Sequence, residues 1–201
     1  MITDVAIDLD GVMFDFANVI KEHFSECLDR DLPDPVKWEF YDEWGLTAEQ
    51  FYYLLDEFSK ERDLFNSEAP VPHSMVGWQS LRDQNLRLHV ITHRSPSAWE
   101  QSIRWLERYR MVPDSLHFSG DKANILTAIS IDECAAIDDH VSQYVSYRDA
   151  GVHAYLMTQT WNALYPGRRV SSLPEFADII KLYNQYQYME EFYAMQELRN
   201  V

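Results

Sequence analysis

The sequence predicts an α/β protein with a parallel sheet flanked by helices. Apolar runs of strand length end in polar residues and are followed by amphipathic stretches, which is the alternation expected of βαβ units. Their apolar and β-branched content favours strands that are buried on both faces, as in a parallel sheet. The runs lie at residues 5–10, 86–93, 115–119, 134–139 and 152–157.

The helices between these runs have recognisable ends. Ser95 and Pro96 provide an N-cap and a first-turn proline for a helix that continues as far as Pro113. Gly151 is placed to end a helix that starts near His140. Further helices are predicted over residues 121–130 and from about residue 173 onward.

A long insertion separates the first two predicted strands. A crossover between parallel strands needs only about a dozen residues, far fewer than residues 11–85 provide. An amphipathic stretch over 12–28 and a capping box formed by Thr47 and Gln50 predict helices there. We therefore expect an α/β core of residues 1–16 and 72–182, a small helical cap of residues 17–71 and a C-terminal helical extension of residues 183–201.

The insertion is rich in aromatic residues, and most of them are expected to fill the interior of a small helical bundle. One or two could instead line a substrate pocket, for which Phe16, Trp44 and Phe65 are the candidates. The C-terminal extension is rich in tyrosine and methionine. It is expected either to pack back on the protein or to form the contact of a homodimer.

Composition narrows the class of protein. The chain has 201 residues and 46% hydrophobic residues, which suits one core with a modest insertion. It contains no apolar run long enough to cross a bilayer and begins with no recognisable signal peptide, so a cytoplasmic location and no membrane partner are expected. Cys27 and Cys134 are too few for a disulfide framework and are expected to be buried thiols.

The charge of the chain is strongly negative. Its 17 basic residues face 33 acidic ones, a formal net charge of −16. Such a field repels polyanions, so long nucleic acid is not expected as a partner. A small phosphorylated substrate remains compatible, because a bound divalent cation reverses the potential locally.

Acidic residues follow two of the predicted strands. Asp8 and Asp10 alternate along an extended segment, so both side chains point to one side at the carboxyl end of the first strand. Asp138 and Asp139 end another strand at the same edge of the predicted sheet. Carboxylates that converge repel one another unless a cation lies between them, and hard oxygen ligands suit Mg²⁺.

Two further residues point to phosphate. Thr92 ends a strand and precedes a proline-started helix, and a hydroxyl beside free backbone N–H groups is a phosphate-binding arrangement. Lys122 stands at a helix start, where the helix dipole disfavours a cation unless an anion is near. A solvated surface lysine is the alternative for Lys122.

In this order, the motifs resemble those of the haloacid dehalogenase-like (HAD) superfamily of phosphohydrolases. The matching stretches are DLDGV at 8–12, VIT at 90–92, Lys122 and AIDD at 136–139. The resemblance covers residues 1 to about 182 and implies a Rossmann-like core, with the insertion at the place of a C1 cap. It also implies that Asp8 is the nucleophile and that Asp10 is the general acid.

The resemblance further implies a ligand set. Mg²⁺ would be held by Asp8, the backbone carbonyl of Asp10 and Asp138, with Asp139 either a further ligand or an outer residue that orients them. Phosphate oxygens would be bound by Thr92 and Lys122. His93 and Arg94, which this chain adds to the same loop, are further candidates of its own.

Within the superfamily, the sequence is most similar to the 5′(3′)-deoxyribonucleotidases. DLDGVMFDF resembles their DxDGVxADF opening, and SPSAWEQSIRWLERY and GDKANIL resemble later stretches. The implied activity is dephosphorylation of (deoxy)nucleoside monophosphates. Two departures bear on the phosphate loop, because His93 and Arg94 precede Ser95 where the family runs directly from threonine to serine, and Gly120 replaces a basic residue.

Other functions stay open on the sequence alone. One is a HAD phosphatase for another small phosphate ester. A second is a phosphatase for nucleic-acid 3′ ends, using Arg168 and Arg169 as a local basic groove. The third is a HAD-fold binding protein without turnover, although the catalytic motif residues are all present.

Overall fold

The structure, a computed structural model, describes residues 1–199, with side chains described up to residue 190. Its centre is a six-stranded sheet of order β3-β2-β1-β4-β5-β6, in which all neighbouring strands are parallel. The strands are β1 (Asp4–Ile7), β2 (Arg87–Thr92), β3 (Ser115–Phe118), β4 (Cys134–Asp138), β5 (His153–Met157) and β6 (Arg169–Val170). The five predicted strands are confirmed, and the two-residue β6 is an addition too short to carry a sequence pattern.

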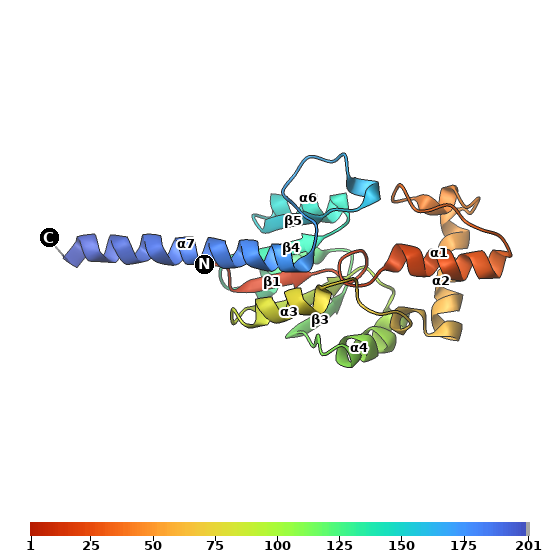
Figure 1. The fold of residues 1–201 in the computed structure, drawn as a ribbon, viewed down its shortest axis with the longest axis horizontal. Coiled ribbons are helices and arrows are strands. Elements are labelled where there is room, and N and C mark those ends of the chain that lie inside the picture. Colours follow the sequence, from red (N-terminus) through yellow and green to blue (C-terminus); the bar gives the residue numbers. More distant parts are fainter. Residues whose placement is uncertain (200–201) are drawn as a thin grey trace.

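Helices cover both faces of the sheet (Figure 1). Helices α3 (Ser74–Arg82) and α7 (Leu173–Arg199) pack together on one face, and α5 (Lys122–Ile129) and α6 (Val141–Asp149) pack on the other. Successive side chains of a strand point to opposite faces, so each face of the sheet has its own apolar cluster. Ile7 and Ile137 pack on the face that α3 and α7 cover, and Ala6 and Ala136 on the face that α5 and α6 cover. The α/β fold class predicted from the sequence is therefore confirmed.

Close packing of α3 on α7 depends on Gly77. A Cβ atom at this position would lie 2.6 Å from the carbonyl carbon of Leu173 and from the nitrogen of Pro174. The two backbones therefore approach each other without a side chain between them.

The predicted helix after Ser95 forms in two parts. The Ser95 hydroxyl accepts a hydrogen bond from the Ser97 N–H at 3.4 Å, and a 3₁₀ turn, η3 (Pro96–Ala98), leads into α4 (Trp99–Arg108). The helix ends a few residues before Pro113, because Arg110 adopts a positive φ of 57°.

The insertion contains α1 (Phe16–Leu28), η1 (Phe40–Asp42), α2 (Ala48–Arg62) and η2 (Leu64–Asn66). The predicted capping box is present, with Thr47 and Gln50 each accepting from the other's backbone N–H. Helix α1 starts later than residue 12, because the Leu9 carbonyl accepts from the N–H groups of Met13 and Phe14 and closes a tight turn there. The helices α1 and α2 lie at the end of the sheet opposite the free half of α7 (Figure 1).

The aromatic residues of the insertion largely pack on one another, as predicted. The ring of Phe24 lies 5.7 Å from that of Trp44, 5.2 Å from that of Phe51 and 5.1 Å from that of Phe58, centroid to centroid. Trp44 is only 1% exposed, and its indole N–H donates to the carbonyl of Pro33 at 3.0 Å.

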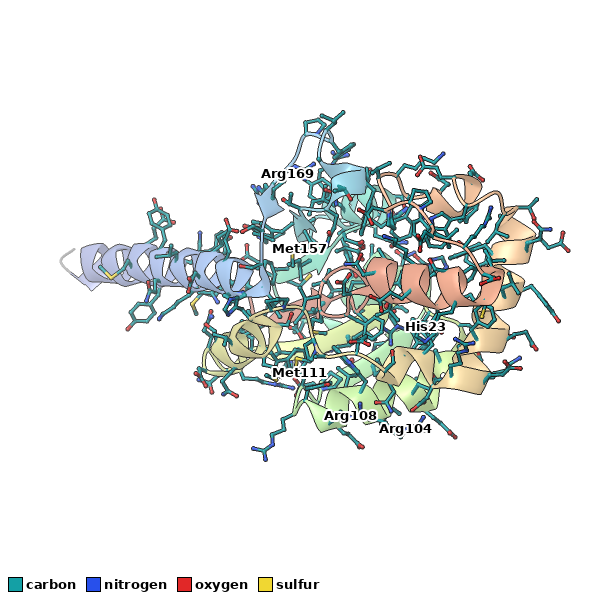
Figure 2. The ribbon with its side chains drawn as sticks, turned by 45° about the vertical axis from the view of Figure 1, so that its right-hand side comes forward. His23, Arg104, Arg108, Met111, Met157 and Arg169 are labelled. Carbon is teal, nitrogen blue, oxygen red and sulfur yellow. The ribbon has the colours of Figure 1, made fainter. Side chains whose placement is uncertain are left out.

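Helix α4 holds the insertion on the core. Arg104 pairs with Asp63, and Arg108 donates to the carbonyl of Asn66 at 2.8 Å. Figure 2 shows both arginines on α4. Gln101 is 7% exposed and accepts from the Phe65 N–H at 3.0 Å, so η2 is fixed against α4. This contact places η2 beside the carboxyl ends of the strands.

Helix α7 is continuous from the core into the predicted C-terminal extension. The side chain of Asn184 accepts from the Ile2 N–H at 2.7 Å and donates to the Ile2 carbonyl at 2.9 Å. Beyond this contact the helix runs away from the sheet and leaves side chains such as Tyr186 and Tyr188 exposed. A homodimer through this segment stays a prediction.

The structure bears on two expectations drawn from composition, one on membrane-spanning helices and one on the cysteines. Among the helices of residues 1–199, none combines the length and the apolar character that crossing a membrane requires. Cys134 is buried, but the prediction that Cys27 is buried is wrong, because it lies on the exposed side of α1.

Candidate active site

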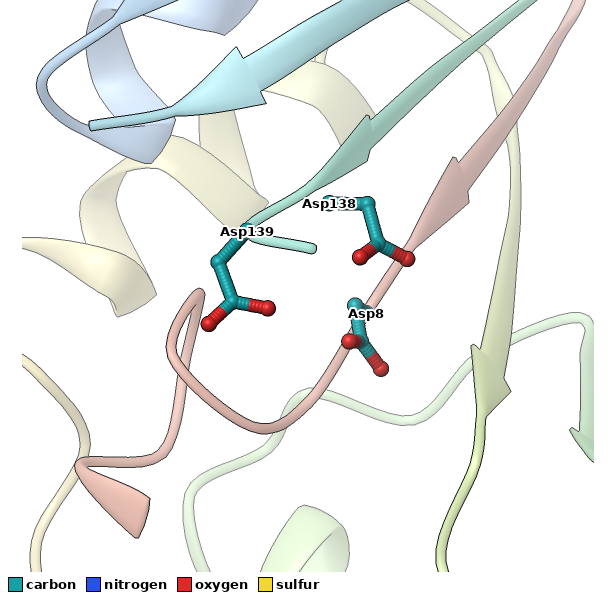
Figure 3. Close-up of side chains that lie close together, drawn as sticks. All are labelled: Asp8, Asp138 and Asp139. Atoms are coloured by element: carbon teal, nitrogen blue, oxygen red, sulfur yellow. The ribbon is translucent and has the colours of Figure 1, made fainter. Parts of the chain in front are cut away.

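Three carboxylates converge at the carboxyl edge of the sheet. Asp8 directly follows β1, Asp138 ends the neighbouring strand β4, and Asp139 comes directly after it (Figure 3). One oxygen from each of the three lies within 4.8 Å of the others, and all three residues are buried. The two pairs of acids, far apart in the sequence, thus meet as predicted because their parallel strands are adjacent.

Lys122 lies inside this cluster. Its Nζ is 2.8 Å from Oδ2 of Asp8 and 2.7 Å from Oδ2 of Asp138. The residue is the first of α5 and is only 1% exposed, so the alternative of a solvated surface lysine is excluded. Asp8 continues the strand face on which Ala6 lies, which is the face that α5 covers, and this brings the lysine and the acid together.

The hydrogen bonds of the three acids differ. Asp8 also accepts from the Leu9 N–H at 2.8 Å, and Asp138 accepts from the His140 N–H at 2.9 Å. Within the part of the chain that the structure describes, the Oδ1 atom of Asp139 is buried without a hydrogen-bond partner. A buried carboxylate oxygen in this state is costly unless a cation binds it.

The electrostatics of the cluster also favour a cation. Burial raises the pKa of Asp8 to about 7, and repulsion from Asp138 and Asp10 adds to this against the opposing effect of Lys122. Burial, with repulsion from Asp138, Asp8 and Asp10, raises the pKa of Asp139 well above its usual range. With all three carboxylates ionised, the single lysine would leave two negative charges unbalanced, which a divalent cation can neutralise.

These observations fit a divalent metal ion. The donors are carboxylate oxygens, which hard divalent cations prefer, and the unpartnered oxygen of Asp139 is available. Gly11 allows the carboxylate of Asp139 to lie close to the backbone, since a Cβ at Gly11 would be 2.1 Å from its Oδ2. Gly11 also has a positive φ of 73°, which glycine adopts without strain.

Asp10 is placed differently from the other acids. Its carboxylate receives hydrogen bonds from Arg94, with Nε 3.0 Å from both oxygens and Nη2 2.6 Å from Oδ1. Its side chain is 17% exposed and does not belong to the three-carboxylate cluster. The expectation that both strand-end acids face one target therefore applies to Asp8 and not to the carboxylate of Asp10.

The other residues predicted to bind phosphate lie at the same edge. Thr92 ends β2 beside β1, is buried, and accepts from the Arg94 N–H at 3.3 Å. His93 is exposed, and its Nε2 lies against Gly120, where a Cβ would be 3.0 Å away.

The three candidate pocket residues are separated by the structure. Phe16 and Phe65 stack with parallel rings 6.3 Å apart. Trp44 instead lies inside the insertion with a buried ring, as described above, and has no surface to offer a substrate. Its placement as a pocket residue is therefore corrected, since neighbouring aromatic rings and the Pro33 carbonyl occupy its contact surface.

Sequence reasoning missed the loop after β5. Gln159 donates to the carbonyl of Gly11 at 2.6 Å, and Asn162 donates to the carbonyl of Asp139 at 2.8 Å, so both residues hold the backbone of the acidic motifs. Thr160 donates to the carbonyl of Pro35 at 2.9 Å and joins the same loop to the insertion. The available signal was their position, because polar residues directly after a parallel strand lie at the active edge.

The insertion also reaches this edge through Trp38. Its ring lies 4.1 Å from that of His140, centroid to centroid, in a T-shaped arrangement. His140 follows directly after the acidic pair of β4, so an aromatic side chain of the insertion lies beside the carboxylate cluster.

The parallel sheet, the insertion after β1 and the lysine among strand-end acids define a haloacid dehalogenase-like phosphohydrolase. Solved structures share this fold. A phosphonoacetaldehyde hydrolase-like protein from Oleispira antarctica superposes with a TM-score of 0.64 at 13% identity, over 92% of this chain and 93% of that one. A haloacid dehalogenase-like hydrolase from Streptococcus pneumoniae gives 0.62 at 14% identity, over 89% and 98%.

Sequence comparison identifies the family within this class. The family model described as "5′ nucleotidase, deoxy (Pyrimidine), cytosolic type C protein" matches residues 1–187. A Chlorobaculum tepidum protein, named as a candidate 5′(3′)-deoxyribonucleotidase, is 28% identical over 189 residues, 89% of this chain and 90% of that protein. The chain belongs to this nucleotidase family and is an enzyme of the phosphatase class.

Proposed function

We propose that the protein hydrolyses the phosphate ester of a deoxynucleoside monophosphate with Mg²⁺ and through an aspartyl-phosphate intermediate. The observation that carries this proposal is the buried cluster of Asp8, Asp138 and Asp139 around Lys122. The substrate class is supported by the family description and by the name of the Chlorobaculum tepidum relative.

In the first step, a carboxylate oxygen of Asp8 attacks the phosphorus atom and forms a new P–O bond. The P–O bond to the nucleoside breaks, and its electron pair stays on the leaving oxygen. That oxygen takes the proton of the Asp10 carboxyl group and leaves as the nucleoside alcohol. The products of this step are an aspartyl-phosphate on Asp8 and an ionised Asp10.

In the second step, a water molecule gives a proton to Asp10 and its oxygen bonds to phosphorus. The P–O bond to Asp8 breaks and returns the electron pair to its carboxylate. Inorganic phosphate is released, and both acids are restored to their starting states.

Neighbouring groups stabilise the charge of the transferred phosphoryl group. The Lys122 ammonium and the Thr92 hydroxyl lie on either side of β1. Both would bind oxygens of the phosphoryl group. The site would hold Mg²⁺ through the carboxylates of Asp8, Asp138 and Asp139 and the backbone carbonyl of Asp10, which neutralises negative charge on the phosphate.

We also propose that residues 17–71 act as a cap that shapes the pocket for the nucleoside. Trp38 beside His140 and the half-buried ring of Phe16 support this, since aromatic rings favour contact with a base. Phe65 is 3% exposed and packs against Phe16 and Arg94, so it supports the ring of Phe16 from behind. Arg169, considered above for nucleic-acid ends, donates to Asn162 and Tyr165 of its own loop, so the structure gives this alternative no support.

The test is phosphate release by the purified protein from a panel of deoxy- and ribonucleoside 5′- and 3′-monophosphates and sugar phosphates. We expect release with MgCl₂, none with EDTA, and preference for deoxynucleotides, with products identified by mass spectrometry. Asp8→Asn should lower kcat by at least about 10³-fold, because the nucleophile is lost.

Asp15→Asn is the matched control, because it removes an exposed acid seven residues along the same segment. It should keep wild-type activity. Absence of phosphate release from every ester, by protein with a native circular dichroism spectrum, would contradict the proposed function. An active Asp8→Asn variant would contradict only the nucleophile.

A further inference from the structure

The guanidinium group of Arg94 is held on all sides by the protein. Two of its nitrogens, Nε and Nη2, donate to the carboxylate of Asp10, and Nη1 donates to the hydroxyl of Ser102 at 2.9 Å. The side chain is only 1% exposed, and Ser102 is fully buried on α4.

Two aromatic rings enclose the same guanidinium group. Its central carbon lies 4.7 Å from the ring centroid of Phe14 and 4.4 Å from that of Phe65. Cations over aromatic faces at such distances are attracted to them, more strongly when shielded from water. Phe14 belongs to the turn after β1 and Phe65 to η2 of the insertion, so Arg94 joins both parts of the protein.

This arrangement leaves Arg94 poorly placed to bind phosphate. Each of its three nitrogens donates to a protein acceptor, which engages three of the five N–H groups, and both faces of the group are covered by rings. Any movement of the group toward a phosphate oxygen would break its contacts with Asp10 and with the two phenylalanine rings.

We infer that Arg94 is a positioning residue that holds the carboxyl group of Asp10 toward the leaving oxygen of the substrate. The inference rests on the proposed function and replaces the expectation that Arg94 binds phosphate. Oδ1 of Asp10 receives two of the three hydrogen bonds from Arg94, and Oδ2 receives one. Oδ2 is therefore the atom freer to exchange a proton with the leaving group. The contact with Phe65 makes this orientation depend on the insertion staying in place.

The test compares two esters that differ in their need for a proton donor. The leaving alkoxide of a deoxynucleoside monophosphate must be protonated, whereas the p-nitrophenolate of p-nitrophenyl phosphate leaves without a proton. For Arg94→Met we expect kcat on the nucleotide to fall about 10²-fold, in the range of general acid catalysis, with KM little changed. On p-nitrophenyl phosphate the loss should be less than about 10-fold.

Further variants report whether Arg94 acts through Asp10. Adding Arg94→Met to Asp10→Asn should cost no further nucleotide activity, because residues that act as a unit are not additive. Ser102→Ala, which removes one support of the guanidinium, should show the same ester dependence in weaker form. Arg148→Met, at an exposed arginine paired with Asp149, is the matched control and should leave both activities unchanged.

Calorimetric binding of inorganic phosphate provides a readout without turnover. Arg94→Met should bind phosphate with an affinity within about twofold of the wild type, since a direct ligand to a phosphate charge would be worth tenfold or more. Equal losses on both esters together with weakened phosphate binding would overturn the inference and make Arg94 a phosphate ligand. Unchanged turnover of both esters would also overturn it.

Failure of the proposed function is distinguishable, because it would appear as inactivity of the wild-type protein on both esters. In that case, weaker phosphate binding by Arg94→Met would still overturn the inference. If Arg94→Met fails to fold, Ser102→Ala decides by the same ester comparison.

Discussion

Gly11 lies directly against the carboxylate of Asp139, with room for a hydrogen atom but not for a methyl group. The Cβ of an alanine at residue 11 would be 2.1 Å from Oδ2 of Asp139 and 2.5 Å from its Cγ. The turn after Asp8 and Asp10 therefore packs directly on the carboxylate of Asp139, which belongs to the second acidic motif.

Gly11→Ala should therefore damage both stability and metal binding. A side chain there has to push Asp139 out of the cluster, and it must also adopt a positive φ. Gly151→Ala is the matched control, because Gly151 has a φ of 82° with nothing within 4 Å of its Cβ position.

Both variants introduce backbone strain, but only Gly11→Ala displaces Asp139. The difference between them therefore measures the effect of that displacement. Gly151→Ala should lower the free energy of unfolding by about 1 kcal/mol, from strain alone, and leave Mg²⁺ binding intact. Gly11→Ala should cost more and weaken Mg²⁺ binding by at least about tenfold in calorimetry. Equal behaviour of the two variants would show that the site tolerates a methyl group.

Mg²⁺ should stabilise the folded protein. The three acids meet only in the native state, so Mg²⁺ binds the folded protein in preference to the unfolded chain. At a free ion concentration of about 100 Kd, the gain in stability should be about 2.7 kcal/mol. Thermal unfolding with MgCl₂, against KCl of equal ionic strength, measures it. Asp139→Asn should lose most of the rise in Tm, and an equal rise in KCl would argue against a specific ion.

Gly77→Ala should destabilise the contact between α3 and α7. The added methyl group would overlap the backbone of Leu173 and Pro174 at 2.6 Å, and overpacking of this kind costs about 1–3 kcal/mol. Urea unfolding measures the change. Val76→Ala on the exposed side of the same helix should change stability by less than about 0.5 kcal/mol.

Asp4 should make the stability of the protein depend on pH. It is fully buried at the start of β1, with Nε2 of His89 2.9 Å away and Nη2 of Arg87 2.7 Å away. Burial alone would raise the pKa of Asp4, yet its hydrogen-bond partners hold it below the usual value. A lowered folded pKa means that the contribution is complete above the unfolded pKa and is lost as the pH falls through the folded one.

Asp4→Asn should accordingly lower the free energy of unfolding by about 1–3 kcal/mol at neutral pH. The difference from the wild type should stay constant above about pH 5 and shrink below about pH 4, as measured by urea unfolding. Asp178→Asn, at an exposed acid on α7, is the control. A difference that persists unchanged in acid would mean that the charge of Asp4 contributes nothing.

The sequence predicted the parts of the site that depend on strand direction. Asp8 and Asp138 follow apolar runs, and parallel strands bring such residues to one edge whatever the strand order. Lys122 at a helix start signalled a nearby anion, which proved to be the pair of acids. The order of strands and the two-residue β6 were not predictable, because they depend on contacts between distant segments.

Side-chain partners were less predictable than positions. Nothing in the local sequence shows that Arg94 turns toward Asp10 and two phenylalanine rings, since those partners come from three separate segments. In the sequence, Trp44 looks no different from an aromatic residue that lines a pocket. In the folded insertion its neighbours bury it. Such choices are made by packing, which a pattern of residue types does not record.

The hydrogen bonds between Asn184 and Ile2 tie helix α7 to the start of the chain. They clamp the entry to β1, and Asp8 stands at the exit of that strand. A chain shortened to residue 182 would lose the clamp, whereas one that ends at residue 187, where the family match ends, would keep it. The first strand is thus anchored at the end of the sheet opposite to the one that carries its acids.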